Sequence, residues 1–427
     1  MWRLALLLLL NCSDGTANVA PTGAPSDDAP HRPAPPTATP PPPASSPPTQ
    51  PACRGCFDER DDRWLPRILP HDAGLGREGL ERLVEAAGNT HSDHLLILYD
   101  AHVVLERHWD DDAAPIETQS LTKSIVALAA LALVADGDLP SLDVPLHRFF
   151  PEMARDGRRA ITLRHVLTQS TGLDASDGVN QADDRLAYAR ALRLKHSPGT
   201  RFRYNNAACQ LLAGVVAQAA GAPLDEYMSR RLFAPLDILR AKWSRDRAGT
   251  VQAYFGLELT SRDLARIGLL MLNEGQWQHS QVLPASLIRE AVAPSRTSLS
   301  YGLLFWRRTT LTQSQAALER YPFLEPLTKR RFRNEDQYFR AVRRHTSKAV
   351  AHGLVIAHPL HIPLLDERPD RDTGYYAVGG LGQRLAVYPK RGIVAVRQHR
   401  RRPGDAQHEK TVHWRSFNED IEGLFSQ

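Results

Sequence analysis

The sequence predicts an α/β fold in which an antiparallel sheet is flanked by helices and interrupted by an inserted, mainly helical domain. Two observations lead to this prediction. Runs rich in β-forming residues lie near both ends of the folded body, at residues 95–107 and 384–396, whereas residues 140–290 contain helical patterns and short polar turns. Sheet segments at both ends of a helical middle are expected when one domain is built from two distant parts of the chain.

The first 56 residues of the 427-residue chain differ from the rest in composition. Thirteen of the 31 prolines fall within residues 21–51. Such a stretch cannot bury enough apolar surface to offset the loss of chain entropy, so residues 13–56 are predicted to form an extended, disordered tether. Residues 57–427, by contrast, have the length and mixed composition of a folded domain.

Residues 1–12 have the pattern of a bacterial secretory signal. Arg3 precedes the apolar run Leu4–Leu10, and Cys12 follows it in a loose lipoprotein box. This pattern predicts export to the bacterial periplasm or cell envelope and membrane attachment through a lipidated Cys12. A cleaved signal peptide and a mis-assigned start codon are the alternatives. No apolar run approaches the roughly 18–20 residues that span a bilayer, which excludes a polytopic membrane protein.

The four cysteines are too few for a disulfide scaffold in a body of this size. Cys53 and Cys56 supply only two of the four ligands of a structural zinc site, so we expect them to form a local disulfide in an oxidising compartment. Cys209 is expected to be a small buried side chain.

Several patterns predict individual elements of the body. Residues 76–88 place apolar side chains at helical spacing and predict an amphipathic helix. Two β-rich runs, residues 95–99 and 103–107, flank a short connection and predict a β-hairpin. Residues 118–137 begin with polar residues, continue with an apolar body and end at a glycine, which predicts a buried helix. Further strands are expected at residues 301–306, 384–388 and 392–396.

The start of the buried helix carries Ser120-Leu121-Thr122-Lys123. Residues three apart lie on one face of a helix, so the Ser120 hydroxyl and the Lys123 amine can come within hydrogen-bonding reach. Free N–H groups at the helix start favour a developing oxyanion near the serine. Burial among apolar residues favours the neutral amine, which can accept a proton. The motif predicts a serine nucleophile with a lysine base, although so short a pattern also arises by chance.

A second polar motif, Phe202-Arg203-Tyr204-Asn205-Asn206, follows later in the chain. The Tyr204 hydroxyl can share or relay the proton of the serine, and Asn206 can hold a substrate amide or Lys123. The signatures of other hydrolases are missing from the sequence. It contains no Gly-x-Ser-x-Gly, no His-Glu-x-x-His and no Walker-type glycine loop.

These motifs together resemble the β-lactamase-related serine hydrolases. That superfamily includes class C β-lactamases, D-alanyl-D-alanine carboxypeptidases, β-lactamase-like esterases and 6-aminohexanoate-dimer hydrolases. Ser120 and Lys123 match its first motif, and Tyr204 and Asn206 match its Tyr-x-Asn motif in the same order. The resemblance covers roughly residues 75–400 and implies a β-lactamase/transpeptidase-like fold. It also implies a structural role for His165.

The resemblance is weaker at the third family element, a strand lining the site with Lys-Thr-Gly or His-x-Gly. Residues 375–383 resemble the glycine-rich version of esterase and amide-hydrolase members, which implies that the N–H of Gly380 joins that of Ser120 in an oxyanion hole. A rival alignment places Asp372-Thr373-Gly374 there. Its aspartate would repel a substrate carboxylate, and the glycine version lacks the cation that would attract one. Both alignments therefore disfavour penicillin-type substrates.

Residues 307–372 fit the family poorly and form an atypical basic insertion. Within them, residues 329–348 carry eight lysines and arginines against Glu335 and Asp336. A nucleic-acid site and a solvated basic face both fit such a cluster. Because the rest of the chain is close to neutral, we favour the solvated face and expect no nucleic-acid partner. The insertion precedes the third family element, so it either shapes the mouth of the site or forms a surface excursion.

The motifs and the resemblance predict an exported serine hydrolase that acts through an acyl-enzyme on a small-molecule ester, amide or peptide. An esterase or peptide-amide hydrolase is favoured over a D-alanyl-D-alanine carboxypeptidase or a class C-like β-lactamase. The alternative from another class is a binding or sensor module that is acylated without turnover. The chemistry requires neither a metal nor an organic cofactor, and the sequence indicates no obligate protein partner.

Overall fold

The computed structural model describes most of the body and none of the first 64 residues. The predicted signal, the tether, Cys12 and the Cys53-Cys56 pair lie outside the described residues and stay predictions. The chain is described over residues 65–109, 114–175, 177–307, 309–313, 318–319, 321–332, 335–346, 365–369, 374–403, 405, 414 and 416–424. All of them belong to the unit Ala52–Gln427.

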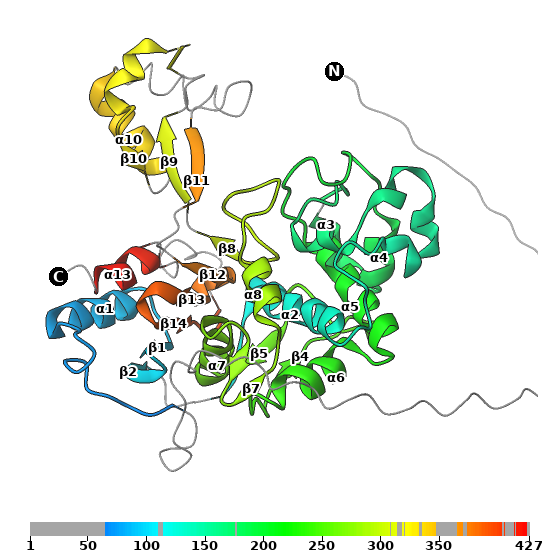
Figure 1. Ribbon diagram of the computed structural model, residues 1–427, viewed down its shortest axis with the longest axis horizontal. Coiled ribbons are helices and arrows are strands. Elements are labelled where there is room, and N and C mark those ends of the chain that lie inside the picture. Colours follow the sequence, from blue (N-terminus) through cyan, green and yellow to red (C-terminus); the bar gives the residue numbers. More distant parts are fainter. Residues whose placement is uncertain are drawn as a thin grey trace, which may run out of the picture. The chain divides into compact units, whose positions relative to one another are not determined.

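A six-stranded antiparallel sheet joins the two ends of the body, in the order β2-β1-β14-β13-β12-β8 (Figure 1). At its centre, Leu96 of β1 lies opposite Val396 of β14. The hairpin predicted over residues 95–107 is confirmed, as are the strands predicted at 384–388 and 392–396. The strands are β1 (His94–Tyr99), β2 (His102–His108), β8 (Trp306–Arg307), β12 (Tyr375–Val378), β13 (Arg384–Tyr388) and β14 (Ile393–Gln398).

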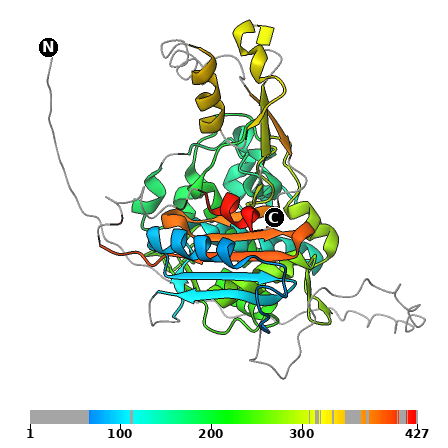
Figure 2. The same ribbon diagram turned by 90° about the vertical axis from the view of Figure 1, so that its left-hand side faces the viewer.

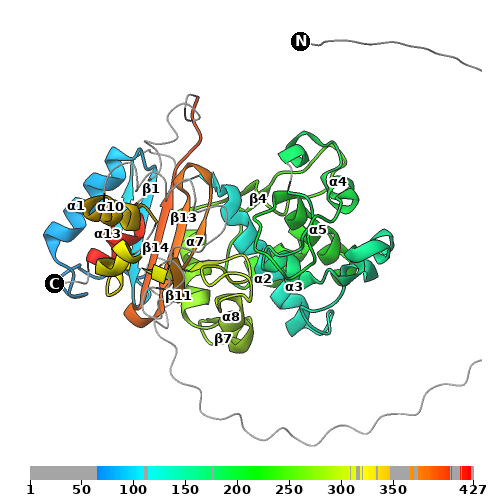
Figure 3. The same cartoon turned by 90° about the horizontal axis from the view of Figure 1, so that it is seen from above.

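Helices cover both faces of this sheet, because successive side chains of a strand point to opposite faces. Ile393 and Ala395 of β14 pack in one apolar cluster with α1 and α13, whereas Val394 and Val396 belong to the cluster that contains α7. Figure 2 shows α1, in blue, lying over the strands, and Figure 3 shows the sheet between its helix layers. These helices are α1 (Arg77–Asn89), α7 (Ser261–Leu272) and α13 (Phe417–Gly423). The helix predicted over residues 76–88 is confirmed.

The helical part of the body surrounds α2, in which residues 122–133 are all buried. The sequence of α2 is apolar on every side, so the helix is stable only where other helices cover it completely. The buried helix predicted over residues 118–137 is confirmed. Among the described helices, none alone is long and apolar enough to cross a membrane, and one bent pair, Asn206–Ala220 with Leu224–Phe233, meets the criteria of length and composition.

The helical part contains two long helices, α2 and α5, and many shorter elements. Its helices are η1 (Gln119–Leu121), α2 (Thr122–Ala135), η2 (Leu146–Arg148), η3 (Pro151–Ala154), η4 (Asp156–Ala160), α3 (Leu163–Leu167), η5 (Asp177–Gln181), α4 (Arg185–Ala191), α5 (Asn206–Ala220), α6 (Leu224–Met228), the π-helix η6 (Ser229–Phe233) and α8 (Ala285–Ala291). Its strands form one sheet ordered β3-β5-β4 and the pair β6-β7. They are β3 (Ile116–Glu117), β4 (Lys242–Trp243), β5 (Leu257–Leu259), β6 (Gln276–Trp277) and β7 (Ser280–Gln281).

The strand predicted over residues 301–306 is wrong for most of its length, since only Trp306–Arg307 pairs as β8. Leu304 has a left-handed backbone with φ of 61°, and the Gly302 N–H donates to the Phe305 carbonyl at 2.9 Å, so the chain turns. The segment is apolar because it is buried in the main core. A buried turn and a buried strand have the same run of apolar residues in the sequence, so the sequence pattern did not distinguish them. Ser124 of α2 fixes the turn by donating to the Leu304 carbonyl at 2.5 Å.

The inserted segment has a sheet and an apolar cluster of its own. The sheet runs in the order β10-β9-β11, and α10 packs beside it through Tyr338, Ala341 and Val342. The three strands and α10 are labelled in Figure 1. The elements of the segment are β9 (Thr309–Gln313), η7 (Pro322–Leu327), β10 (Arg331–Phe332), α10 (Glu335–His345) and β11 (Leu365–Pro369). Two further short helices, η8 (Gly380–Gly382) and η9 (Pro389–Arg391), lie in the main sheet's connections.

Close packing of α7 on the main sheet yields a stability prediction. A Cβ atom added at Gly268 would lie 2.4 Å from Val394 Cγ1 and 2.9 Å from Leu385 Cδ1. Gly268→Val should therefore overpack this contact and lower the free energy of unfolding by about 1–3 kcal/mol. Urea denaturation measures the change. Gly423→Val is the matched control, because a Cβ at Gly423 meets nothing within 4 Å. Equal midpoints for the two variants would contradict the packing.

Candidate active site

Ser120 lies in η1, between the end of β3 and the start of α2. The preceding residue, Gln119, has a left-handed backbone with φ of 52°, which redirects the chain from the strand into the helix. Thr118 anchors this turn: its N–H donates to the Leu257 carbonyl at 2.8 Å, and its hydroxyl lies 2.9 Å from that of Thr122. The half-buried Ser120 is thus held on a fixed turn at the edge of the core.

Lys123 is buried beneath Ser120 on the first turn of α2. Its Nζ donates to Ser120 Oγ at 2.7 Å and to the Tyr254 carbonyl at 2.8 Å, and its side chain is almost completely excluded from solvent. Burial lowers the pKa of Lys123 to about 8, because the charged ammonium loses its hydration. At pH 7 roughly a tenth of the amine is therefore unprotonated and able to take the proton of Ser120.

Tyr204, two residues before the start of α5, also lies beside Ser120. Burial raises the pKa of the Tyr204 phenol above its usual value, and a hydrogen bond with Ser120 acts against that rise. Lys123 Nζ lies 5.0 Å from the centre of the Tyr204 ring. The structure therefore brings the three predicted catalytic side chains together, with a neutral phenol and a lysine amine next to one hydroxyl.

Asn206 is the first residue of α5 and lines the same pocket as Ser120. Its Oδ1 is buried and has no hydrogen-bond partner among the described residues. Buried polar atoms are nearly always paired in folded proteins, so an unpaired one beside a candidate nucleophile is suited to accept an N–H from a bound molecule.

The glycine-rich segment after β12 lies against the serine turn. A Cβ atom added at Gly379 would come within 2.2 Å of the Thr118 carbonyl, and one added at Gly380 would lie 3.6 Å from Gln119 Oε1. Gly374, from the rival alignment, lies at the other end of β12 against the Val387 carbonyl, while residues 372 and 373 are outside the described part of the chain. This arrangement favours Gly380, whose role in an oxyanion hole stays a prediction.

Arg397 of β14 holds the glycine-rich segment in place. It is fully buried, and its guanidinium donates to the carbonyls of Leu381 at 3.3 Å and Gly382 at 2.8 Å and to Ser92 Oγ at 2.7 Å. Burial and the nearby Arg384 lower the pKa of Arg397 to about 9. The main sheet thereby fixes the position of η8 next to the serine turn.

The pocket beside Ser120 has a volume of about 320 Å³ and is mostly polar. Two of its lining residues are arginines that the sequence patterns did not predict: Arg185 of α4 and Arg401 after β14. These two arginines bring positive charge to the pocket, although the glycine version of the third element has no cation of its own. The lining residues are Glu117, Gln119, Ser120, Asn180, Arg185, Asn206, Tyr254, Phe255 and Arg401.

These additional residues hold one another in place. Arg185 stacks on the Phe255 ring at 5.3 Å and donates to the Asn180 carbonyl at 3.0 Å, and the Tyr254 hydroxyl donates to Asn180 Oδ1 at 2.9 Å. Burial raises the pKa of Glu117, while the positive charge of Arg401 acts to lower it. No local motif marks these residues, because they meet only after the chain folds.

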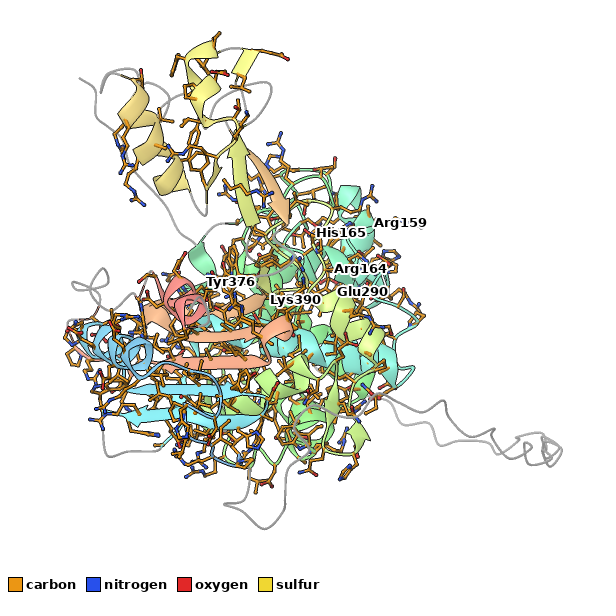
Figure 4. The ribbon with its side chains drawn as sticks, turned by 60° about the vertical axis from the view of Figure 1, so that its left-hand side comes forward. Arg159, Arg164, His165, Glu290, Tyr376 and Lys390 are labelled. Atoms are coloured by element: carbon orange, nitrogen blue, oxygen red, sulfur yellow. The ribbon has the colours of Figure 1, made fainter. Side chains whose placement is uncertain are left out.

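His165 does not line this pocket. Its Nδ1 accepts the Thr162 N–H at 3.1 Å in the cap of α3, as the implied structural role requires. The neighbouring Arg164 bonds to both carboxylate oxygens of Asp143 and reaches Glu290 of α8 at 2.5 Å (Figure 4). Cys209 is a buried free thiol, as predicted. In the described part of the chain, no group of three or more His, Cys, Asp or Glu residues is arranged to hold a metal ion.

Comparison with known proteins finds relatives of several activities. The chain is 33% identical over 140 residues to the esterase EstB of Burkholderia gladioli, covering 27% of this chain and 35% of that protein. It is 27% identical over 238 residues to the 6-aminohexanoate-dimer hydrolase of Paenarthrobacter ureafaciens, covering 50% and 60%. Each match spans less than two thirds of the relative's own length.

The fold is shared with solved structures. A Bacillus anthracis protein assigned as a 6-aminohexanoate-dimer hydrolase superposes with a TM-score of 0.58 at 17% identity, covering 84% of this chain and 86% of that one. The predicted β-lactamase/transpeptidase-like fold is thus confirmed. The family model described as Beta-lactamase matches residues 80–415, more than half of the chain. The chain therefore belongs to the beta-lactamase family of serine hydrolases.

Proposed function

We propose that this protein hydrolyses an ester or an amide through an acyl-enzyme formed on Ser120. The observation that carries the proposal is the 2.7 Å contact between Lys123 Nζ and Ser120 Oγ at the base of a polar pocket. A serine hydroxyl is a weak nucleophile unless a base removes its proton, and a buried lysine with a lowered pKa is such a base.

In the proposed reaction, Ser120 Oγ attacks the substrate carbonyl while Lys123, with Tyr204, takes its proton. The N–H groups of Ser120 and Gly380 stabilise the negative oxygen of the tetrahedral intermediate. The same proton then passes through Lys123 or Tyr204 to the departing alcohol or amine. Water, deprotonated by the same pair, attacks the acyl-enzyme and releases the acid, and Ser120 regains its proton.

Within this reaction class, an esterase or peptide-amide hydrolase is the first candidate. The chain lacks Lys-Thr-Gly, and the relatives named above are an esterase and an amide hydrolase. Arg185 and Arg401 favour a second candidate, a hydrolase of carboxylate-bearing substrates such as a D-alanyl-D-alanine carboxypeptidase or a class C-like β-lactamase, since a guanidinium pairs well with a carboxylate.

Replacement of the nucleophile tests the proposal. Ser120→Ala should reduce turnover of short-chain p-nitrophenyl esters by about 10³-fold or more, because no other group of the site can form the acyl-enzyme. Steady-state hydrolysis measures this loss. Equal turnover by the variant and the wild type would contradict the assignment. Acylation of wild type by a fluorophosphonate without turnover of any ester, amide or β-lactam would instead support the binding or sensor module.

The pH dependence of hydrolysis tests the role of Lys123. Because the neutral amine is the base and burial sets its pKa to about 8, kcat/KM should rise with pH below that value and level off above it. Lys123→Arg should lose this ascending limb and most of the activity, since a guanidinium does not deprotonate. A flat profile between roughly pH 6 and 9 in the wild type would contradict this role.

The pocket arginines predict a preference for anionic substrates. The test compares an ester that has a terminal carboxylate in its acyl group with the neutral methyl-capped analogue of that ester. The ratio of their kcat/KM values, anionic over neutral, should fall about tenfold in Arg401→Gln, because the variant loses one charged contact. Arg402→Gln is the control, because Arg402 pairs with Asp93 and does not line the pocket. An unchanged ratio in Arg401→Gln would exclude this preference.

A further inference from the structure

The inserted segment contains a second pocket, of about 270 Å³, formed between β10 and α10. The family resemblance does not account for this segment, and the proposed reaction does not use it. Four of the six residues that line the pocket are arginines. The six are Arg330, Arg331, Phe332, Arg340, Ala341 and Arg344.

Apolar packing fixes the two walls of this pocket relative to each other. Phe332 of β10 meets Tyr338 of α10 edge to face, with ring centres 5.2 Å apart, and both side chains are buried. Ala341 and Val342 continue the buried face of the helix. Arg340 and Arg344, four residues apart, lie together along one side of α10 and face the exposed arginines of the β10 wall.

Four guanidinium groups line this small pocket together. Like charges four residues apart on a helix repel each other, and two more guanidinium groups face this pair across the pocket. Among the residues whose side chains are described, no carboxylate forms an ion pair with any of the four arginines. A bound anion would relieve the repulsion, and a phosphate offers the oxygen pairs that guanidinium groups bind in a two-pronged fashion.

We propose that this pocket binds a phosphate group, carried either by a phospholipid headgroup or by a soluble phosphate. One water molecule occupies about 30 Å³, so the pocket has room for a phosphate with part of the molecule that carries it. Single-stranded nucleic acids would also need exposed aromatic rings on which bases stack, whereas the one ring in this pocket, Phe332, is buried in the cluster. This inference does not depend on the proposed hydrolase activity.

Two double variants of the full chain test the proposal. Arg340→Gln with Arg344→Gln removes two pocket arginines, and glutamine has a helix propensity close to that of arginine. Lys329→Gln with Arg343→Gln removes the same charge from exposed residues of the same segment that do not line the pocket. Circular dichroism checks the folding of both. Binding is measured by calorimetry with inorganic pyrophosphate and by sedimentation with phosphatidylcholine vesicles, with and without phosphatidic acid.

We expect the pocket variant to bind at least one of these probes roughly 100-fold more weakly than the wild type, and the control variant to bind like the wild type. Binding of pyrophosphate alone identifies a soluble phosphate, and binding of phosphatidic acid vesicles identifies a headgroup. If binding were weakened equally in both variants, the proposed pocket would be wrong, and the anion would be held by the general positive charge of the segment. Binding of neither probe by the wild type would also overturn it, as would tighter binding of a single-stranded DNA oligonucleotide than of either phosphate probe.

Discussion

The burial of one lysine is the constraint on which the rest of the site depends. Removing an ammonium group from water is costly, and Lys123 offsets part of that cost through its bonds to Ser120 Oγ and the Tyr254 carbonyl. These bonds do not offset the whole cost, so the charged form stays disfavoured and the pKa of Lys123 is lowered. The same burial that disfavours the charged amine makes it a usable base. The apolar α2 therefore serves the chemistry as well as the core.

The site forms where the main sheet meets the helical part of the body. Ser120 comes from the turn before α2, Tyr204 from the segment before α5, and Gly380 from the end of β12. None of these segments is near another in sequence, so the register of the sheet and the packing of α2 against α5 must both be correct. Arg397 links the two requirements, because it anchors η8 from the centre of the sheet.

The sequence predicted what local patterns encode, and it failed where distant segments meet. The buried helix at 118–137 and the hairpin at 95–107 follow from periodicity over a few residues. Residues 301–306 have the apolar character of a strand because they are buried, but the turn at Leu304 depends on contacts with α2 and α3. Arg185 and Arg401 were not predicted as site residues for the same reason, because they line one pocket only after both parts of the chain have folded.

The identity of the nucleophile is the central claim, and mass spectrometry of the fluorophosphonate-labelled protein tests it most directly. Digestion of the labelled wild type should place a single adduct on the peptide that contains Ser120. The presence of an excess of an intact ester that the enzyme hydrolyses should slow the formation of this adduct. The chemistry requires that Lys123→Arg label far more slowly at the same residue. An adduct on a different serine, or an equal yield of adduct in Ser120→Ala, would contradict the mechanism.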